Sequence, residues 1–229
     1  LTVASQVSIA TGGTPFSVRI EAVDRGGNVV PSQSGEVEAS LARAGGWSGQ
    51  LSGTTRAFVF AGVASFIDLK LNTEGACYVL KFTSEGLAAC EAEPITVIIG
   101  PAQTVVMVTN PEGIMPGKAM QIQPSVAVVD AGNNIVSSAR DEIEVWLLDG
   151  FGQRRPLCSW KLLGARDCVT SLQAVGGTAV FTGLRVDIAG DGFRLRFGKK
   201  RGGFQEAESQ MFQVVVGPAV MMDIVREPE

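Results

Sequence analysis

Four cysteines carry the most distinctive side-chain chemistry of this 229-residue chain. Cys77 and Cys90 flank a predicted hairpin turn at residues 84–86, and Cys158 and Cys168 flank a second predicted turn at residues 163–165. Four cysteines allow three disulfide connectivities. Only the local pairing, Cys77 with Cys90 and Cys158 with Cys168, keeps each bridge within one half of the chain, so we predict that pairing. Four reduced thiols, as expected in a cytosolic protein, are the alternative.

The sequence contains no histidine, the commonest general base and a frequent zinc ligand. Ser-His-Asp and Cys-His nucleophile pairs and histidine zinc sites are therefore excluded within this chain. The Gly-x-Ser-x-Gly, Walker A and Gly-x-Gly-x-x-Gly motifs are also absent. Acidic pairs such as Glu91 with Glu93 alternate along predicted strands, whereas a glycosidase needs two carboxylates across a cleft. We expect no enzymatic activity and no cofactor.

Two acidic turns are candidates for binding calcium. Asp24 begins the turn at residues 24–28, and Asp130 begins a similar turn at residues 130–134. Ca²⁺ takes six to eight oxygen ligands, and one Asp with one Asn supplies too few of them. The alternative is that each Asp caps its own turn while Gly and Asn adopt positive φ. We expect this capping role and no metal site.

Tryptophan side chains are the first candidates for contacts with a partner. Trp146 shares the strand phase of Glu144, so its ring is expected on the outer face of a sheet. There it is either an interface anchor or part of a cluster in which Trp160 and the inserted segment 154–168 fold back over it. Trp47, in a glycine-rich loop, is a weaker candidate.

A basic run at residues 194–201 is the second candidate, and it ends in Lys199, Lys200 and Arg201. Such a run binds sulphated glycans or acidic partners in some proteins. We favour a solvated hairpin tip, with the apolar residues of the run pointing inward. The net charge of −4 and the pI near 5.0 argue against nucleic acid as a partner. No run approaches 18 apolar residues, so no membrane insertion is expected within this segment.

The elements that position these residues are predicted to be strands. Apolar and polar residues alternate at residues 18–22, 37–41, 78–82 and 143–147, and the alternating runs are separated by Gly, Asn and Asp. This period of two indicates half-buried antiparallel strands, and no window shows a helical apolar stripe. About seven strands in a hundred residues is the size of an immunoglobulin-like (Ig-like) sandwich.

Internal similarity divides the chain into repeats. Residues 24–30, 62–69, 75–82 and 99–102 match residues 130–136, 177–184, 190–197 and 216–219 in the same order. We therefore predict an Ig-like domain at 1–100, a second at 101–217 with an inserted hairpin, and the start of a third repeat at 218–229. Only Gly-Pro links each unit to the next, so neighbouring units are expected to be held stiffly and nearly end to end.

These motifs resemble a known family. Residues 100–111, the pair Pro116-Gly117 and residues 123–136, together with residues 51–55, 62–66, 75–80 and 84–87, resemble bacterial-type Ig-like repeats. Such repeats form tandem arrays in large cell-surface and adhesin-like proteins. The resemblance implies an all-β chain of tandem Ig-like antiparallel β-sandwiches. The family pattern usually lacks cysteine, so the four cysteines are a departure that favours an oxidising exterior.

The resemblance implies a non-catalytic structural or interaction module: a stalk, adhesin segment or fibre component of a large extracellular or cell-surface protein. Its partners would be neighbouring repeats, other copies of the chain or another surface protein. One alternative is a carbohydrate-binding accessory module of a secreted enzyme. Another is a filamin-like intracellular scaffold, because filamin-type repeats also carry such acidic turns and Gly-Pro-Ala junctions.

Overall fold

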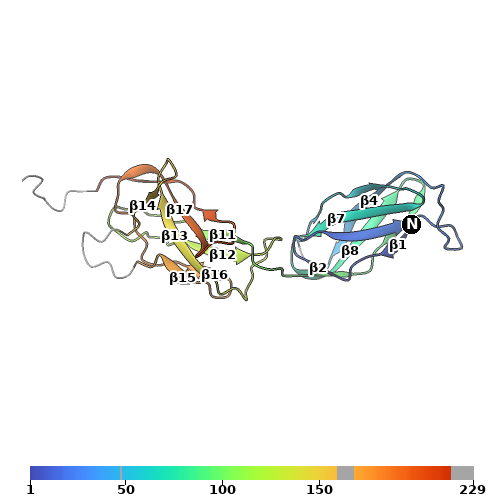
Figure 1. Ribbon diagram of the computed structural model, residues 1–229, viewed down its shortest axis with the longest axis horizontal. Coiled ribbons are helices and arrows are strands. Elements are labelled where there is room, and N and C mark those ends of the chain that lie inside the picture. The colour runs from blue at the N-terminus through green and yellow to red at the C-terminus, as the bar shows by residue number, and fades with distance from the viewer. Residues whose placement is uncertain (47, 159–167, 218–229) are drawn as a thin grey trace, which may run out of the picture. The chain divides into compact units, whose positions relative to one another are not determined.

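The computed structural model describes residues 1–46, 48–158 and 168–217 (Figure 1). This part of the chain contains nineteen strands and no helix, which confirms the predicted all-β fold. Accordingly, none of the residues described here belongs to a helix that could cross a membrane. The predicted start of a third repeat, residues 218–229, lies outside the described residues.

The chain forms two compact units. Unit 1 contains Leu1–Gln103 and also Val129–Val136, and unit 2 contains Thr104–Val128 and the chain from Ser137 onward. The sequence boundary after residue 100 thus lies three residues before the first continuous part of unit 1 ends. The short segment 129–136 was predicted to belong to the second domain, but it packs as part of unit 1.

Unit 1 is built from two sheets (Figure 1). One sheet has the strand order β1 (Thr2–Ser5), β3 (Phe16–Glu21), β7 (Val63–Leu71) and β5 (Leu51–Ser52). The other has the order β2 (Ile9–Thr11), β10 (Ile95–Ile98), β8 (Gly75–Ser84), β4 (Glu36–Ala44) and β6 (Arg56–Phe58), and β9 (Leu87–Glu91) also pairs with β8.

One strand pair of unit 1 departs from the predicted antiparallel pattern. β2 runs parallel to β10, with Ile9 opposite Thr96 and Thr11 opposite Ile98. The chain enters through β1 at the edge of the first sheet and then crosses to the edge of the second sheet as β2. This crossing places the N-terminal segment in both sheets and ties their edges together.

The core of unit 1 fills the space between its two sheets. Phe66 of β7 and Phe82 of β8 come from opposite sheets, and their ring centroids lie 5.4 Å apart. Of the inward positions predicted from the alternation in β3, β4 and β8, Leu41 is half-buried. The others are buried, namely Val18, Ile20, Val37, Ala39, Tyr78, Leu80 and Phe82. Unit 1 is therefore an Ig-like β-sandwich.

Unit 2 also contains two sheets (Figure 1). The smaller has the order β11 (Thr104–Thr109), β12 (Ser125–Val129) and β16 (Thr178–Val180). The larger has the order β14 (Arg154–Arg155), β13 (Glu142–Leu148), β17 (Gly190–Lys199) and β18 (Ala207–Glu208), with β15 (Ser171–Gln173) pairing with β13 and β19 (Phe212–Val214) with β17.

An aromatic pair occupies the core of unit 2 as it does in unit 1. The ring centroids of Phe181 and Phe197 lie 5.3 Å apart, and both side chains are fully buried. Phe181 follows β16 of the smaller sheet and Phe197 belongs to β17 of the larger sheet, so the pair again joins the two layers. Unit 2 is a second Ig-like sandwich with its own core.

Because each unit has its own core, a core truncation should weaken one unit alone. Phe82→Ala is expected to lower the free energy of unfolding of unit 1 by about 3–5 kcal/mol, the usual effect of emptying a buried aromatic site. Ile67→Ala, at an exposed position of β7 in the same unit, is the matched control, with a loss below about 1 kcal/mol. Calorimetry or urea unfolding should show that Phe82→Ala moves one of two transitions and Phe197→Ala the other. A single transition that both variants shift equally would contradict separate cores.

Candidate functional site

The outer face of the larger sheet of unit 2 carries Trp146, the first candidate contact residue. Trp146 of β13 pairs opposite Arg196 of β17. Ile143, Val145 and Leu147 of the same strand are buried in the core, so the side chain of Trp146 lies on the opposite, outer face. It is half-buried there.

An arginine lies over one face of the Trp146 ring. The guanidinium carbon of Arg154, on the neighbouring strand β14, lies 4.3 Å from the centroid of the indole ring. On β17, a Cβ added at Gly198 would come within 3.1 Å of the ring's Cη2 atom, so the indole lies close to the backbone of this strand. A cation therefore occupies one face of the ring. Trp160 and Trp47, the other two tryptophan candidates, lie outside the described residues.

Beyond Trp146, this face carries a network of ion pairs. Glu208 of β18 accepts a hydrogen bond from Arg194 at 2.9 Å and others from Arg196. Arg196 also lies 3.6 Å from Glu206. The hydrogen bond from Arg194, and then that from Arg196, hold the pKa of Glu208 below its usual value. Arg194 and Arg196 thus each have a carboxylate beside them.

The two lysines at the end of the basic run form ion pairs with carboxylates at the beginning of β13. Lys199 lies 2.8 Å from Asp141, and its ammonium sits 4.5 Å from the ring centroid of Phe204. Lys200 donates to Glu142 at 2.6 Å; this hydrogen bond and a second one from Ser171 lower the pKa of Glu142. The apolar residues of the run point into the core, as predicted, and Arg201 is exposed at positive φ.

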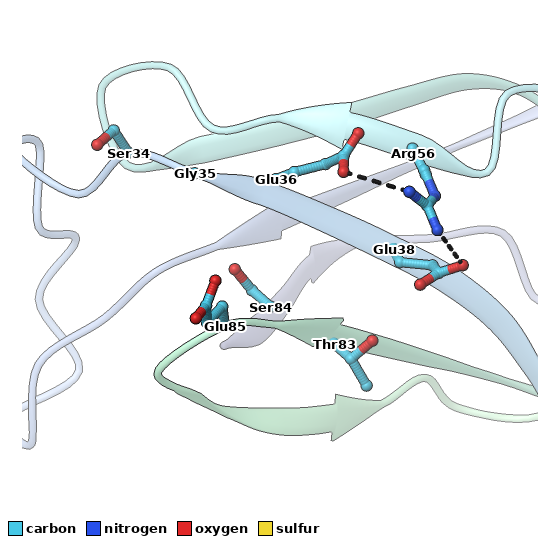
Figure 2. A pocket seen from close by; sticks show the side chains of 8 residues that line it. All are labelled: Ser34, Gly35, Glu36, Glu38, Arg56, Thr83, Ser84 and Glu85. Atoms are coloured by element: carbon cyan, nitrogen blue, oxygen red, sulfur yellow. Dashed lines mark hydrogen bonds and ion pairs between the residues drawn. The ribbon is translucent and has the colours of Figure 1, made fainter.

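A hollow in unit 1 was not foreseen from the sequence. It measures about 590 Å³ and is lined by Ser34, Gly35, Glu36, Glu38, Arg56, Thr83, Ser84 and Glu85 (Figure 2). Arg56 reaches both Glu38 at 3.2 Å and Glu36 at 3.6 Å. Figure 2 shows the carboxylate of Glu85 at the opposite end of the hollow from Arg56. The alternation of Glu36 and Glu38 in β4 could have indicated two carboxylates on one face of the strand. The sequence could not show that Arg56 lies between them, because Arg56 belongs to another strand, β6.

Both acidic turns have the capping geometry. In the first, Asp24 Oδ1 accepts hydrogen bonds from the N–H groups of Gly26 and Asn28 at 2.8 and 2.9 Å. These bonds, with the Asn28 backbone first, lower the pKa of Asp24. Asp130 Oδ1 likewise accepts from Gly132 and Asn134, both at 2.9 Å. Within the described residues, no group of three or more His, Cys, Asp or Glu could hold a metal ion.

The cysteines behave differently in the two units. Cys158 and Cys168 form a disulfide with their Cα atoms 6.3 Å apart. The predicted Cys77–Cys90 bridge is wrong, because both thiols are free. Cys90 of β9 pairs opposite Phe82 of β8, and Cys77 lies five residues earlier on β8. At ~3.3 Å per residue this places the two cysteines roughly 16 Å apart, whereas bridged Cα atoms lie within about 7 Å.

No protein-family model and no curated protein matches this chain. Among solved structures, it is similar to the adhesin InvE of Yersinia pseudotuberculosis, with 14% identity, a TM-score of 0.35 and coverage of 92% of this chain and 58% of that one. It is similar to invasin, a bacterial integrin-binding protein, with 14% identity, a TM-score of 0.36 and coverage of 91% and 38%. It is also similar to β-glucuronidase 3 of Bacteroides uniformis, with 13% identity, a TM-score of 0.34 and coverage of 90% and 23%. The chain spans less than two thirds of each of these proteins.

The cysteine arrangement predicts a specific thiol count. The denatured, unreduced chain should take up two alkylating groups, and the reduced chain four, as read by intact mass. In the native protein Cys77 should react first, because it is exposed. Burial raises the pKa of the Cys90 thiol and so lowers its thiolate fraction at neutral pH. Cys77→Ser should remove the fast phase alone, and a tryptic peptide linking Cys77 to Cys90 would contradict this arrangement.

The ion pairs of Glu208 predict an acid-dependent stability of unit 2. Because the folded-state pKa of Glu208 lies below its unfolded value, the unfolded chain binds the proton more readily. The stabilisation is therefore present above the ordinary carboxylate pKa, about 4.3, and is lost as pH falls below it. Urea unfolding between pH 6 and pH 3 should show a shallower decline for Glu208→Gln than for the native chain, by roughly 0.5 kcal/mol for partly exposed pairs. Glu112→Gln, at an exposed position of the same unit, is the control, and equal slopes for all three proteins would contradict the assignment.

Proposed function

We propose that this chain belongs to an extracellular or cell-surface protein in which Ig-like units act as non-catalytic structural and interaction modules. A stalk, an adhesin segment or a fibre component is the form we favour. The observation that carries the proposal is that each unit is a complete sandwich, with a separate core centred on its own phenylalanine pair. Units that fold independently can be added in series to build length.

The polar chemistry of the outer faces supports a structural role. Glu36 and Glu38 pair with Arg56 in unit 1, and Glu208 pairs with Arg194 and Arg196 in unit 2. Carboxylates held by arginines across neighbouring strands strengthen a sheet, whereas general acid–base catalysis needs a carboxyl group positioned at a substrate. We therefore propose that this chain has no enzymatic activity of its own.

The Cys158–Cys168 disulfide supports an extracellular location. Disulfides persist in oxidising environments and are rare in the cytosol, where thiols are kept reduced. The disulfide therefore favours a surface protein over the filamin-like intracellular scaffold. The carbohydrate-binding alternative would use Trp146 as a platform on which a sugar ring stacks. The guanidinium of Arg154 already lies over one face of that ring, which disfavours stacking of a sugar on the same face.

Stretching single molecules tests the modular role. The native chain should give two discrete unfolding events, one for each sandwich. Reduction should lengthen only the event of unit 2, by about 30 Å, because it releases the ten-residue loop closed across 6.3 Å. Cys158→Ser with Cys168→Ser should show the longer step without reductant, and Cys77→Ser should leave both steps unchanged.

Two outcomes would contradict the proposal. Extension without discrete events would show that the units do not bear load as separate modules. Binding of this fragment to a glycan array, lost in Trp146→Ala and kept in Phe204→Ala, would instead assign the outer face of unit 2 to carbohydrate recognition.

A further inference from the structure

Two turns of the chain share one internal architecture. In each, an Asp accepts hydrogen bonds at Oδ1 from the backbone N–H groups two and four residues later, and the Asn side chain donates back to the Asp carboxylate. In each, the Asp N–H also donates to the Asn carbonyl, at 2.9 Å from Asp24 and 3.0 Å from Asp130. These bonds fix the carboxylate and the amide in the same orientation at both sites, so both turns present the same polar groups.

The turn at 130–134 is held by three backbone groups of unit 1. The Gly100 N–H donates to Asp130 Oδ2 at 2.8 Å, and the Glu74 N–H donates to Asn134 Oδ1 at 2.8 Å. Asn134 Nδ2 donates to the Asn72 carbonyl at 2.7 Å. Only 2% of the solvent-accessible surface of Asp130 is exposed, so these contacts bury its carboxylate. The turn therefore acts as a ligand of a surface that unit 1 builds from its own backbone.

Two glycines give this surface its shape. A Cβ at Gly12 would lie 2.8 Å from Asp130 Oδ2 and would overlap the Asn134 amide. Gly13, at φ +68°, would overlap the backbone of Ala131 in the same way. Only residues without a side chain allow the turn to approach this closely. We call Gly12, Gly13 and the backbone groups of Asn72, Glu74 and Gly100 the turn-binding surface.

The turn at 24–28 presents the same groups, and none of the described residues forms such a surface against it. All five of its residues are exposed. Within the part of the chain that the structure describes, Asp24 Oδ2 accepts only from the Asn28 amide, and nothing donates to Asn28 Oδ1. A Cβ at Gly26 would meet only Asp24 and Asn28, whereas one at Gly132 would meet Asn72 and Gly12 of the turn-binding surface.

A third turn shows that this geometry is not a general property of acidic turns. Asp149 Oδ1 accepts from the N–H groups of Phe151 and Gln153 at 3.0 and 2.9 Å. The last residue of this turn is Gln153, and its side-chain amide donates no hydrogen bond to the Asp149 carboxylate. The Asp–Asn pair, which orients an acceptor and a donor together, is therefore the feature that the turns at 24–28 and 130–134 share.

We propose that the Asp24–Asn28 turn is a docking element that binds the turn-binding surface of another Ig-like unit. It would form the same three hydrogen bonds as Asp130 and Asn134: two from backbone N–H groups and one to a backbone carbonyl. We commit to a unit that precedes Asp24 in the same chain, because Gly100 and Asp130 are joined through thirty residues of one chain. The proposal rests on the proposed function only in requiring such units in series.

The test attaches a second copy of residues 1–103, the first continuous part of unit 1, to the N-terminus of the full chain. Only the added copy carries ¹⁵N, and amide hydrogen exchange is measured at its Glu74 and Gly100. We expect both amides to exchange roughly tenfold more slowly than in the same protein carrying Asp24→Ala and Asn28→Ala, the effect of about one hydrogen bond each. Arg25→Ala, at an exposed position within the turn that does not donate to the carboxylate, is the matched control and should keep the protection.

A second variant separates docking from the integrity of the turn. Gly12→Ala in the added copy leaves the Asp24–Asn28 turn untouched but obstructs the surface, so it should abolish the protection as well. Equal exchange at Glu74 and Gly100 with the native and the Asp24→Ala, Asn28→Ala turns, while core amides such as Leu80 stay protected, would overturn the proposal. Protection that depends on protein concentration would assign the partner to a second molecule and overturn the same-chain commitment. The two unfolding events and the disulfide-dependent step do not involve this turn, so they test the proposed function separately.

Discussion

The burial of one face of every long strand between two sheets is the constraint on which this structure depends. Side chains alternate along a strand, so packing one face against a second sheet decides which residues become core and which become surface. Phe66 with Phe82, and Phe181 with Phe197, join the two layers of their units. With these pairs in place, Trp146 must lie on an outer face, together with the glutamates and arginines of the same sheets.

The outer faces then follow an electrostatic rule. Neighbouring strands bring opposite charges side by side, as with Arg56 beside Glu38 and Arg194 beside Glu208. Such pairs contribute little individually to stability at an exposed site, but they leave few charges without a partner on the sheet. The cover of Arg154 over Trp146 belongs to the same pattern, because a cation from the next strand satisfies the π-face of the indole.

The backbone is the other source of recognition in this chain. Loop N–H and C=O groups that no strand uses must find partners, and unit 1 satisfies the Glu74 and Gly100 amides and the Asn72 carbonyl with side chains of residues 130–134. A surface made of glycines and backbone groups is specific for shape and for hydrogen-bond direction rather than for charge. This makes an Asp–Asn turn a suitable ligand and gives the inferred role of residues 24–28 its chemical basis.

Features that depend on neighbours along the chain could be predicted from the sequence. The alternation at residues 37–41 and 78–82 predicted strands with the correct buried face, and the Asp-led turns predicted their own capping, because periodicity and side chain–backbone bonds are local. Tertiary structure decided what depends on register and on long-range packing. The β8–β9 register carries Cys77 away from Cys90, and residues 129–136 belong to unit 1 although the repeat pattern places them in the second domain. Tertiary structure also brought Arg154 of the neighbouring strand β14 over one face of Trp146. A strand pattern specifies which face is buried, but pairing between distant residues specifies which side chains meet.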